Sequence, residues 1–184
     1  MTERGERAAG GDDRAGLRSR PPALPTGRSA LRIREGTLAD LETVVVLRLA
    51  LLREHAANRI YSRLRPDAPQ RARRLFAAQL ASPQEVTFLA ERGGDVVGIL
   101  RCVESAGSPL LFPDRYGYVS SVYVRPEARR GGVLKQLLAA AERWCRQRGL
   151  DELRLHSTIE GESGNRAWSA LGFEVAEYSR TKRI

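Results

Sequence analysis

The sequence predicts a single mixed α/β domain, built around a central sheet of about six strands. Three observations support this. At 184 residues the chain has room for one ordinary domain with a real core. Short stretches rich in β-branched residues alternate along it with longer stretches whose apolar residues recur at helical spacing. No internal repeat is apparent, so a repeat architecture is not expected.

The first 29 residues are expected to form a disordered tail, and residues 30–184 the domain itself. The tail is rich in Gly, Ala, Arg and acidic residues, with three prolines close together and little apolar surface to bury. Its acidic residues argue against a transit peptide, and it has no apolar segment that would serve as a secretory signal. No run approaches the roughly 18 apolar residues of a membrane helix. We therefore expect a cytoplasmic protein that does not bind membranes.

The domain is predicted to begin with a strand followed by a helix. Leu31 and Ile33 alternate with arginines, as a half-buried strand requires. Thr37 has the residue type of an N-cap, and Asp40 follows three residues later in a capping-box position. Apolar residues then recur at helical spacing, which predicts a helix over about 39–57.

A second short helix and a meander of strands are predicted next. The helix, at 71–81, follows two chain-breaking prolines. Residues 86–91 and 95–103 are strand-like and are separated by a Gly-Gly pair at 93–94, a hairpin signal because glycine takes the positive φ angles of tight turns. Residues 116–124, dense in Tyr, Val and Ser, give the strongest strand of the sequence.

The last third of the chain is predicted to alternate helices with strands. After Pro126 the apolar residues form one stripe of a strongly amphipathic helix. Gly149 would end this helix as a C-cap. The remaining predicted elements are a strand at 153–157, a short helix at 165–170 and a final strand at 173–178.

The net charge of +9 invites a nucleic-acid-binding interpretation, because a basic surface attracts phosphate. Nearly all of this charge is arginine, since Lys135 and Lys182 are the only lysines, and genome base composition can produce such a bias. No zinc finger, basic zipper or aromatic RNA-binding motif accompanies it, so specific nucleic-acid binding is not expected. With two distant cysteines, Cys102 and Cys145, and two histidines, neither a disulfide framework nor a metal site is expected.

The most informative stretch runs from Val122 to Lys135, where a strand passes through a basic, glycine-containing turn into a helix. Helix N-termini carry unpaired N–H groups and the positive end of the helix dipole, and glycine lets a phosphate approach the backbone. The stretch therefore predicts a pyrophosphate site, to which Arg129, Arg130 and Lys135 add charge. It is neither a P-loop nor a dinucleotide fingerprint. On its own it is also compatible with a glycine-rich helix start that carries exposed arginines.

Two motifs in the chain resemble those of the GNAT superfamily of acetyltransferases. The stretch Val-x-Pro-x-x-Arg-Arg-x-Gly-Val is similar to the family's cofactor motif, with Arg129 at its first position, Gly132 as its glycine, and Leu134 in place of the usual final small residue. Downstream, Trp168-Ser-Ala-Leu-Gly-Phe173 is similar to the family's aromatic-x-x-Leu-Gly-Phe element. The resemblance covers about residues 31–178. It implies a mostly antiparallel sheet with helices on both faces.

The resemblance implies an N-acetyltransferase that moves an acetyl group from acetyl-CoA to a primary amine by direct attack in a ternary complex. The amine would belong to a small molecule, a peptide N-terminus or a lysine. The pantetheine arm would lie between the splayed fourth and fifth strands, and a backbone N–H at Val122 would stabilise the oxyanion. The implied cofactor-binding residues are Val122, Tyr123, Val124, Arg129, Arg130, Gly131, Gly132, Val133, Leu134, Lys135 and Asn165.

The group that deprotonates the amine is not identified by either motif. A free alkyl amine has a pKa near ~10, so a base or a water chain must remove its proton. Glu104 and Tyr118 are our leading candidates, and Ser120, His156 and Glu160 are further ones.

The family's usual proton donor to the departing sulfur is replaced in this chain. Trp168 aligns with that tyrosine, and an indole N–H can donate a hydrogen bond but cannot supply a proton. The family's usual asparagine aligns with Gly161, so Asn165 is the residue expected to reach the pantetheine arm. A thiol has a pKa near ~8.5, so a thiolate can still leave without full protonation.

Two other functions stay open from the sequence. The departures at Trp168 and Gly161, with no obvious base, would also suit a catalytically inactive acyl-CoA-binding module. A basic nucleic-acid-binding protein is the remaining alternative. The first two helices and the loop at 105–115 would select the acceptor, and a homodimer is compatible with the superfamily.

Overall fold

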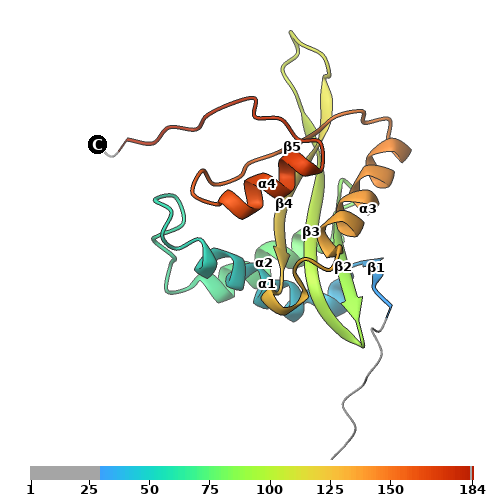
Figure 1. Ribbon diagram of the computed structural model, residues 1–184, viewed down its shortest axis with the longest axis vertical. Helices are drawn as coiled ribbons and strands as arrows, with labels where there is room; N and C mark the ends of the chain where they lie inside the picture. Colours follow the sequence, from blue (N-terminus) through green and yellow to red (C-terminus); the bar gives the residue numbers. More distant parts are fainter. Residues whose placement is uncertain (1–29, 183) are drawn as a thin grey trace, which may run out of the picture.

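The structure, a computed structural model, describes residues 30–182 and 184. It contains one five-stranded sheet of order β1-β2-β3-β4-β5 with helices on both faces (Figure 1). The strands are β1 (Arg32–Glu35), β2 (Glu85–Arg92), β3 (Asp95–Ala106), β4 (Arg115–Val124) and β5 (Leu153–Leu155). The helices are α1 (Leu41–Glu54), α2 (Ala68–Ala81), α3 (Val133–Gln147) and α4 (Glu162–Ala170). The predicted fold class is confirmed, while the predicted tail at 1–29 lies outside the described residues.

The sheet is mostly antiparallel, as expected. β1 to β4 pair antiparallel in chain order, and only β4 and β5 run parallel. The predicted hairpin joins β2 to β3 at Gly93 and Gly94, whose φ angles are 62° and 90°. Both glycines thus take the positive φ that this tight turn demands.

The strand predicted over 173–178 does not form, so the sheet has five strands and not six. The described residues after Phe173 carry no strand, and Val175 and Tyr178 are each 76% exposed. Figure 1 shows this segment leaving the body of the domain beyond α4. Alternating apolar residues indicate β-propensity, but a strand also needs a neighbour to accept its hydrogen bonds, and local sequence does not specify one.

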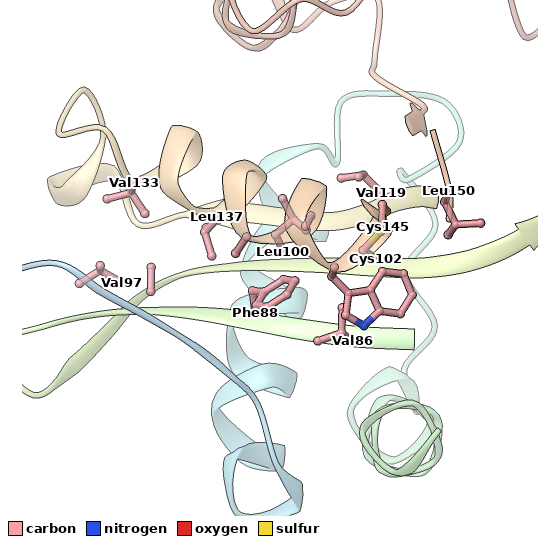
Figure 2. Close-up of a cluster of buried hydrophobic side chains, with 14 of the residues drawn as sticks. Val86, Phe88, Val97, Leu100, Cys102, Val119, Val133, Leu137, Cys145 and Leu150 are labelled. Carbon is pink, nitrogen blue, oxygen red and sulfur yellow. The ribbon is translucent and has the colours of Figure 1, made fainter. Parts of the chain in front are cut away.

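Two apolar clusters hold the helices against the sheet. We call the side covered by α3 the α3 face and the side covered by α1 and α2 the α1 face. On the α3 face, Leu137 of α3 is fully buried against Leu100 and Val119 of the sheet (Figure 2). On the α1 face, α1 packs its apolar side on Leu89 and Ile99. The amphipathic pattern of α3 is therefore confirmed, and Gly149, with φ 69°, follows its end as predicted.

The helices were compared with the length and apolar character that a membrane-spanning helix needs. Within residues 30–182 and 184, none of them is both long and apolar enough to cross a bilayer.

A glycine in β4 lets three elements meet, and its substitution gives a first prediction. A Cβ on Gly117 would lie 2.5 Å from Cys145 Sγ and 2.7 Å from Leu153 Cδ2. Since both neighbours are packed side chains, Gly117→Ala should lower the free energy of unfolding by about 1–3 kcal/mol. Gly164→Ala in α4 is the control, because a Cβ there meets nothing within 4 Å. Thermal melts that do not separate the two variants would contradict this account.

Candidate active site

A β-bulge in β4 shapes the centre of the site. Ile99 pairs with Tyr123 while Arg101 pairs with Ser120, so two residues of β4 lie opposite Leu100 alone. Ser121 in the bulge has φ 55°, a left-handed conformation that costs a non-glycine residue energy. The extra residue also shifts the alternation of side chains along the strand.

The bulge therefore places different residues on each face of the sheet. Tyr118 and Ser120 lie toward the α1 face, whereas Val122 and Val124, beyond the bulge, pack against the cluster of the α3 face. Tyr123 packs on the α1-face cluster. A regular strand would have put Ser120 and Val122 on the same face.

Beyond the bulge, β4 and β5 no longer pair. Their pairing runs from Gly117 with Leu153 to Val119 with Leu155 and ends there. On the other edge, Tyr123 pairs with Ile99, and the Arg125 N–H donates to the Val97 carbonyl at 2.9 Å.

This register sets the direction of the backbone groups in the second half of β4. Because backbone groups in an antiparallel ladder alternate in direction, those of Val122 and Val124 point to the edge that β5 has left. The divergence expected between the fourth and fifth strands is therefore present. It leaves the backbone groups of Val122 and the Val124 N–H without a strand partner, while the Val124 carbonyl accepts from Arg129 Nε.

The turn from β4 to α3 offers backbone N–H groups to an anion. Gly132 is the N-cap of α3 with φ 76°, and Arg130 before it has φ 60°. The Gln136 N–H donates to the Gly132 carbonyl at 3.1 Å, so the preceding N–H groups of the first turn, at Val133 to Lys135, have no helical partner. A Cβ on Gly132 would meet no atom within 4 Å, which leaves the approach to these groups open.

The side chains of the first turn of α3 differ in burial, and Arg129 of the motif has partners within the protein. Val133 is buried, Leu134 is half-buried, and Arg130 and Lys135 are exposed. The Arg129 side chain instead donates from Nε to the Val124 carbonyl at 2.9 Å and from Nη2 to Glu54 at 2.6 Å. Its charge is thus paired with α1, and its side chain ties the turn to the end of β4 and to α1.

Arg92 is a basic residue near this turn that the sequence did not reveal. Its guanidinium lies against Gly131, with Nη2 3.5 Å from the Gly131 carbonyl. Arg92 ends β2, far from the motif in sequence, so only the folded sheet brings its charge to the turn.

A tyrosine and a histidine meet where β4 and β5 separate. The Tyr118 hydroxyl lies 2.8 Å from Nδ1 of His156, and the two rings meet edge to face at 5.5 Å. Burial raises the pKa of Tyr118, so the phenol is protonated at neutral pH. A neutral phenol can both accept a hydrogen bond from an imidazole N–H and donate one elsewhere.

The structure separates the two leading candidates for the base. Glu104 pairs with Gly117 in the sheet, its carboxylate accepts from Arg115 Nη1 at 2.6 Å, and it lies near Cys145 on the α3 face. Tyr118 lies on the opposite face. Register, which the sequence pattern does not fix, therefore places the two candidates on opposite faces of the sheet.

The other candidate residues each have a partner within the protein. Glu160 accepts from Asn58 Nδ2 at 2.8 Å, and this hydrogen bond lowers the pKa of its carboxyl. The Asn165 amide donates to the Thr158 carbonyl at 2.9 Å and closes the loop before α4. Trp168 packs edge to face on Phe173 at 5.4 Å. Ser120 accepts from Arg101 at 3.0 Å.

Comparison with known proteins identifies this arrangement. Residues 51–173 match the model of the acetyltransferase (GNAT) family. The chain belongs to the GNAT family. Acetyl-CoA is therefore its acyl donor and an amine its acceptor.

Two relatives of this GNAT protein cover most of its length. It is 31% identical over 157 residues to an aminoglycoside N(6')-acetyltransferase type 1 of Stenotrophomonas maltophilia, covering 81% of this chain and 90% of that protein. It is 26% identical over 168 residues to an aminoalkylphosphonate N-acetyltransferase of Salmonella typhimurium, covering 91% and 98%. The relatives thus act on chemically different amines.

Solved structures agree on the GNAT fold. The aminoglycoside N-acetyltransferase AAC(6')-Iy in complex with CoA has a TM-score of 0.69 and 24% identity, covering 88% of this chain and 99% of that one. A predicted acetyltransferase of Clostridium acetobutylicum with acetyl-CoA has a TM-score of 0.69 and 18% identity, covering 84% and 96%.

Proposed function

We propose that this GNAT protein acetylates the primary amine of a small molecule, with His156 as the base and Tyr118 as its partner. One observation carries the proposal: the Tyr118–His156 hydrogen bond lies where β4 and β5 part, at the boundary between the exposed β4 backbone and the α1 face. The amine would approach from the α1 face, and the thioester would reach it through the gap between the strands.

The exposed backbone and the α3 N-terminus would hold the donor. Groups of Val122 and Val124 at the open edge would bond the pantetheine arm, with Tyr123 between them and Asn165 shaping the far side of the gap. The N–H groups from Arg130 to Lys135 would hold the pyrophosphate. Arg129 would hold the turn, Gly131 and Gly132 would leave room for the phosphates, and Val133 and Leu134 would anchor the first helical turn.

In the reaction, the amine attacks the thioester carbon while His156 removes its proton. With its own proton on Nδ1, shared with Tyr118, the imidazole offers the Nε2 lone pair to the amine. The Val122 N–H would stabilise the oxyanion, and the carbon–sulfur bond then breaks to release the CoA thiolate. The Tyr118 hydroxyl supplies a proton to that sulfur and recovers one from Nδ1 of His156. The imidazole, now protonated on Nε2, returns to its starting tautomer by exchanging protons with water. Trp168 then need not act as the acid.

A thiol-release assay with purified protein, acetyl-CoA and a panel of amines tests the proposal. Acetyl-dependent release of CoA with at least one small amine is the expected result. The panel should include aminoglycosides and aminoalkylphosphonates, the acceptors named for two relatives. Saturable acetyl-CoA binding in calorimetry, with no turnover on any amine, would favour an inactive acyl-CoA-binding module instead.

Glu104 provides a second prediction because it lies on the other face. Glu104→Gln removes an ion pair whose side chains are 51% and 26% exposed, so neither stability nor kcat/KM should change much. Steady-state kinetics and a thermal melt check both. A large fall in kcat with an unchanged melting temperature would restore Glu104 as the base.

Two predictions from the sequence accompany this proposal. We expect the protein to act in the cytoplasm. We also consider assembly as a homodimer, and analytical ultracentrifugation of the purified protein would distinguish a dimer from a monomer.

A further inference from the structure

Arg48 lies on α1 in surroundings where a charge is costly. It is the only charged residue in the apolar run from Val44 to Leu52, and it is half-buried. Burial lowers the pKa of its guanidinium, and the charge of Arg101 lowers it further, whereas Tyr61 and Tyr118 act in the opposite direction. An arginine in such a place normally has a carboxylate partner.

Carboxylates near this part of the α1 face already have partners. Glu85 binds Arg101, Glu54 binds Arg129, and Glu160 accepts from Asn58. Across residues 30–182 and 184, no carboxylate lies within ion-pair distance of Arg48. The guanidinium beside Tyr118 thus carries a positive charge that the described part of the protein does not neutralise.

We propose that the acceptor is a small primary amine that also carries an oxyanion, a carboxylate or a phosphonate, and that Arg48 binds this oxyanion. The planar guanidinium donates two parallel hydrogen bonds to such a group and neutralises its charge. Arg48 belongs to α1, which packs against β4 on the face toward which Tyr118 lies, and Tyr118 is hydrogen-bonded to His156. An acceptor bound to Arg48 would therefore have its amine end near the proposed base. This inference rests on the proposed function, because it assigns the acceptor of the same site.

A polycationic acceptor fits these surroundings poorly. Each added ammonium group would be repelled by Arg48, and the repulsion is strong where the charges are shielded from water. The same charge that attracts an oxyanion therefore selects against aminoglycosides.

The first experiment compares small amines that carry or lack an oxyanion with a polycationic acceptor. The wild-type protein is assayed with 2-aminoethylphosphonate, β-alanine, propylamine and the aminoglycoside kanamycin, and kcat/KM is measured for each. We expect both oxyanion-bearing amines to exceed propylamine by at least about tenfold, and kanamycin to be the poorest. The ratio between phosphonate and carboxylate shows which oxyanion is preferred. Kanamycin or propylamine equal to or better than both would overturn the proposal.

The second experiment removes the charge. Arg48→Gln should raise KM for the preferred oxyanion-bearing amine by at least about tenfold and change kcat less, whereas Arg53→Gln, an exposed arginine of the same helix, is the matched control. Arg48→Lys keeps the charge but loses the paired geometry, so its KM should lie between those of wild type and Arg48→Gln. Unchanged KM in a folded Arg48→Gln would overturn the proposal.

The oxyanion site can be tested even if the proposed acetylation is not observed. If no amine is acetylated, calorimetry of 2-aminoethylphosphonate and β-alanine with the CoA-loaded protein tests the oxyanion site alone. Binding to the wild type that is lost in Arg48→Gln would support the site without the reaction. No binding of either compound to the wild type would overturn the site as well.

Discussion

Replacing His156 with alanine should lower kcat for amine acetylation by about 10²- to 10⁴-fold, the usual contribution of a positioned general base. His156 is exposed just after β5, and its Nδ1 is hydrogen-bonded to the Tyr118 hydroxyl. The substitution removes no core packing, so the melting temperature and the affinity for acetyl-CoA should change little. Stopped-flow or steady-state thiol release checks the loss.

Tyr118→Phe separates the two roles in this pair. It retains the ring and removes the hydroxyl, so it should lower kcat less than His156→Ala if the phenol only orients the imidazole and donates to sulfur. The two effects should not add in the double variant, because both residues act through one hydrogen bond. Additive effects, or full activity of His156→Ala at neutral pH, would remove this pair from the mechanism.

Much of the fold followed from local patterns. The α3 stripe and the Gly-Gly hairpin are set by neighbouring residues, and the structure has both where they were predicted. The strand expected at 173–178 failed because its existence depends on a partner strand, which local sequence does not encode. Helix ends were less accurate: the first helix runs over Leu41–Glu54 where 39–57 was predicted, and the second begins at Ala68 where 71 was predicted.

The candidate site depended more on long-range contacts. The motif located the turn before α3. It could not predict the ion pair of Arg129 with Glu54, because Glu54 lies in α1, far from the motif in sequence. The register that pairs Glu104 with Gly117 puts Glu104 and Tyr118 on opposite faces of the sheet, and the sequence could not fix that register. Arg48 did leave a signal, a single charge in an apolar run of the first helix.

Gly132→Val should weaken acetyl-CoA binding by about tenfold to a hundredfold, the loss expected when one charged hydrogen bond or more is blocked. The side chain would project into the open space before the first turn of α3, where the pyrophosphate is proposed to lie. No protein atom lies within 4 Å of the added Cβ, so the fold should be retained. Titration calorimetry measures the affinity, and a thermal melt measures the fold.

Backbone strain has to be separated from this effect, since Gly132 has φ 76° and valine rarely adopts such a conformation. Gly94→Val is the matched control, because Gly94 has φ 90°, its Cβ would also meet nothing within 4 Å, and it lies in the β2–β3 turn. The two variants should lose similar stability, while only Gly132→Val loses affinity for the coenzyme. Equal affinities in both would show that the pyrophosphate does not approach Gly132, and the donor would then have to bind elsewhere on the domain.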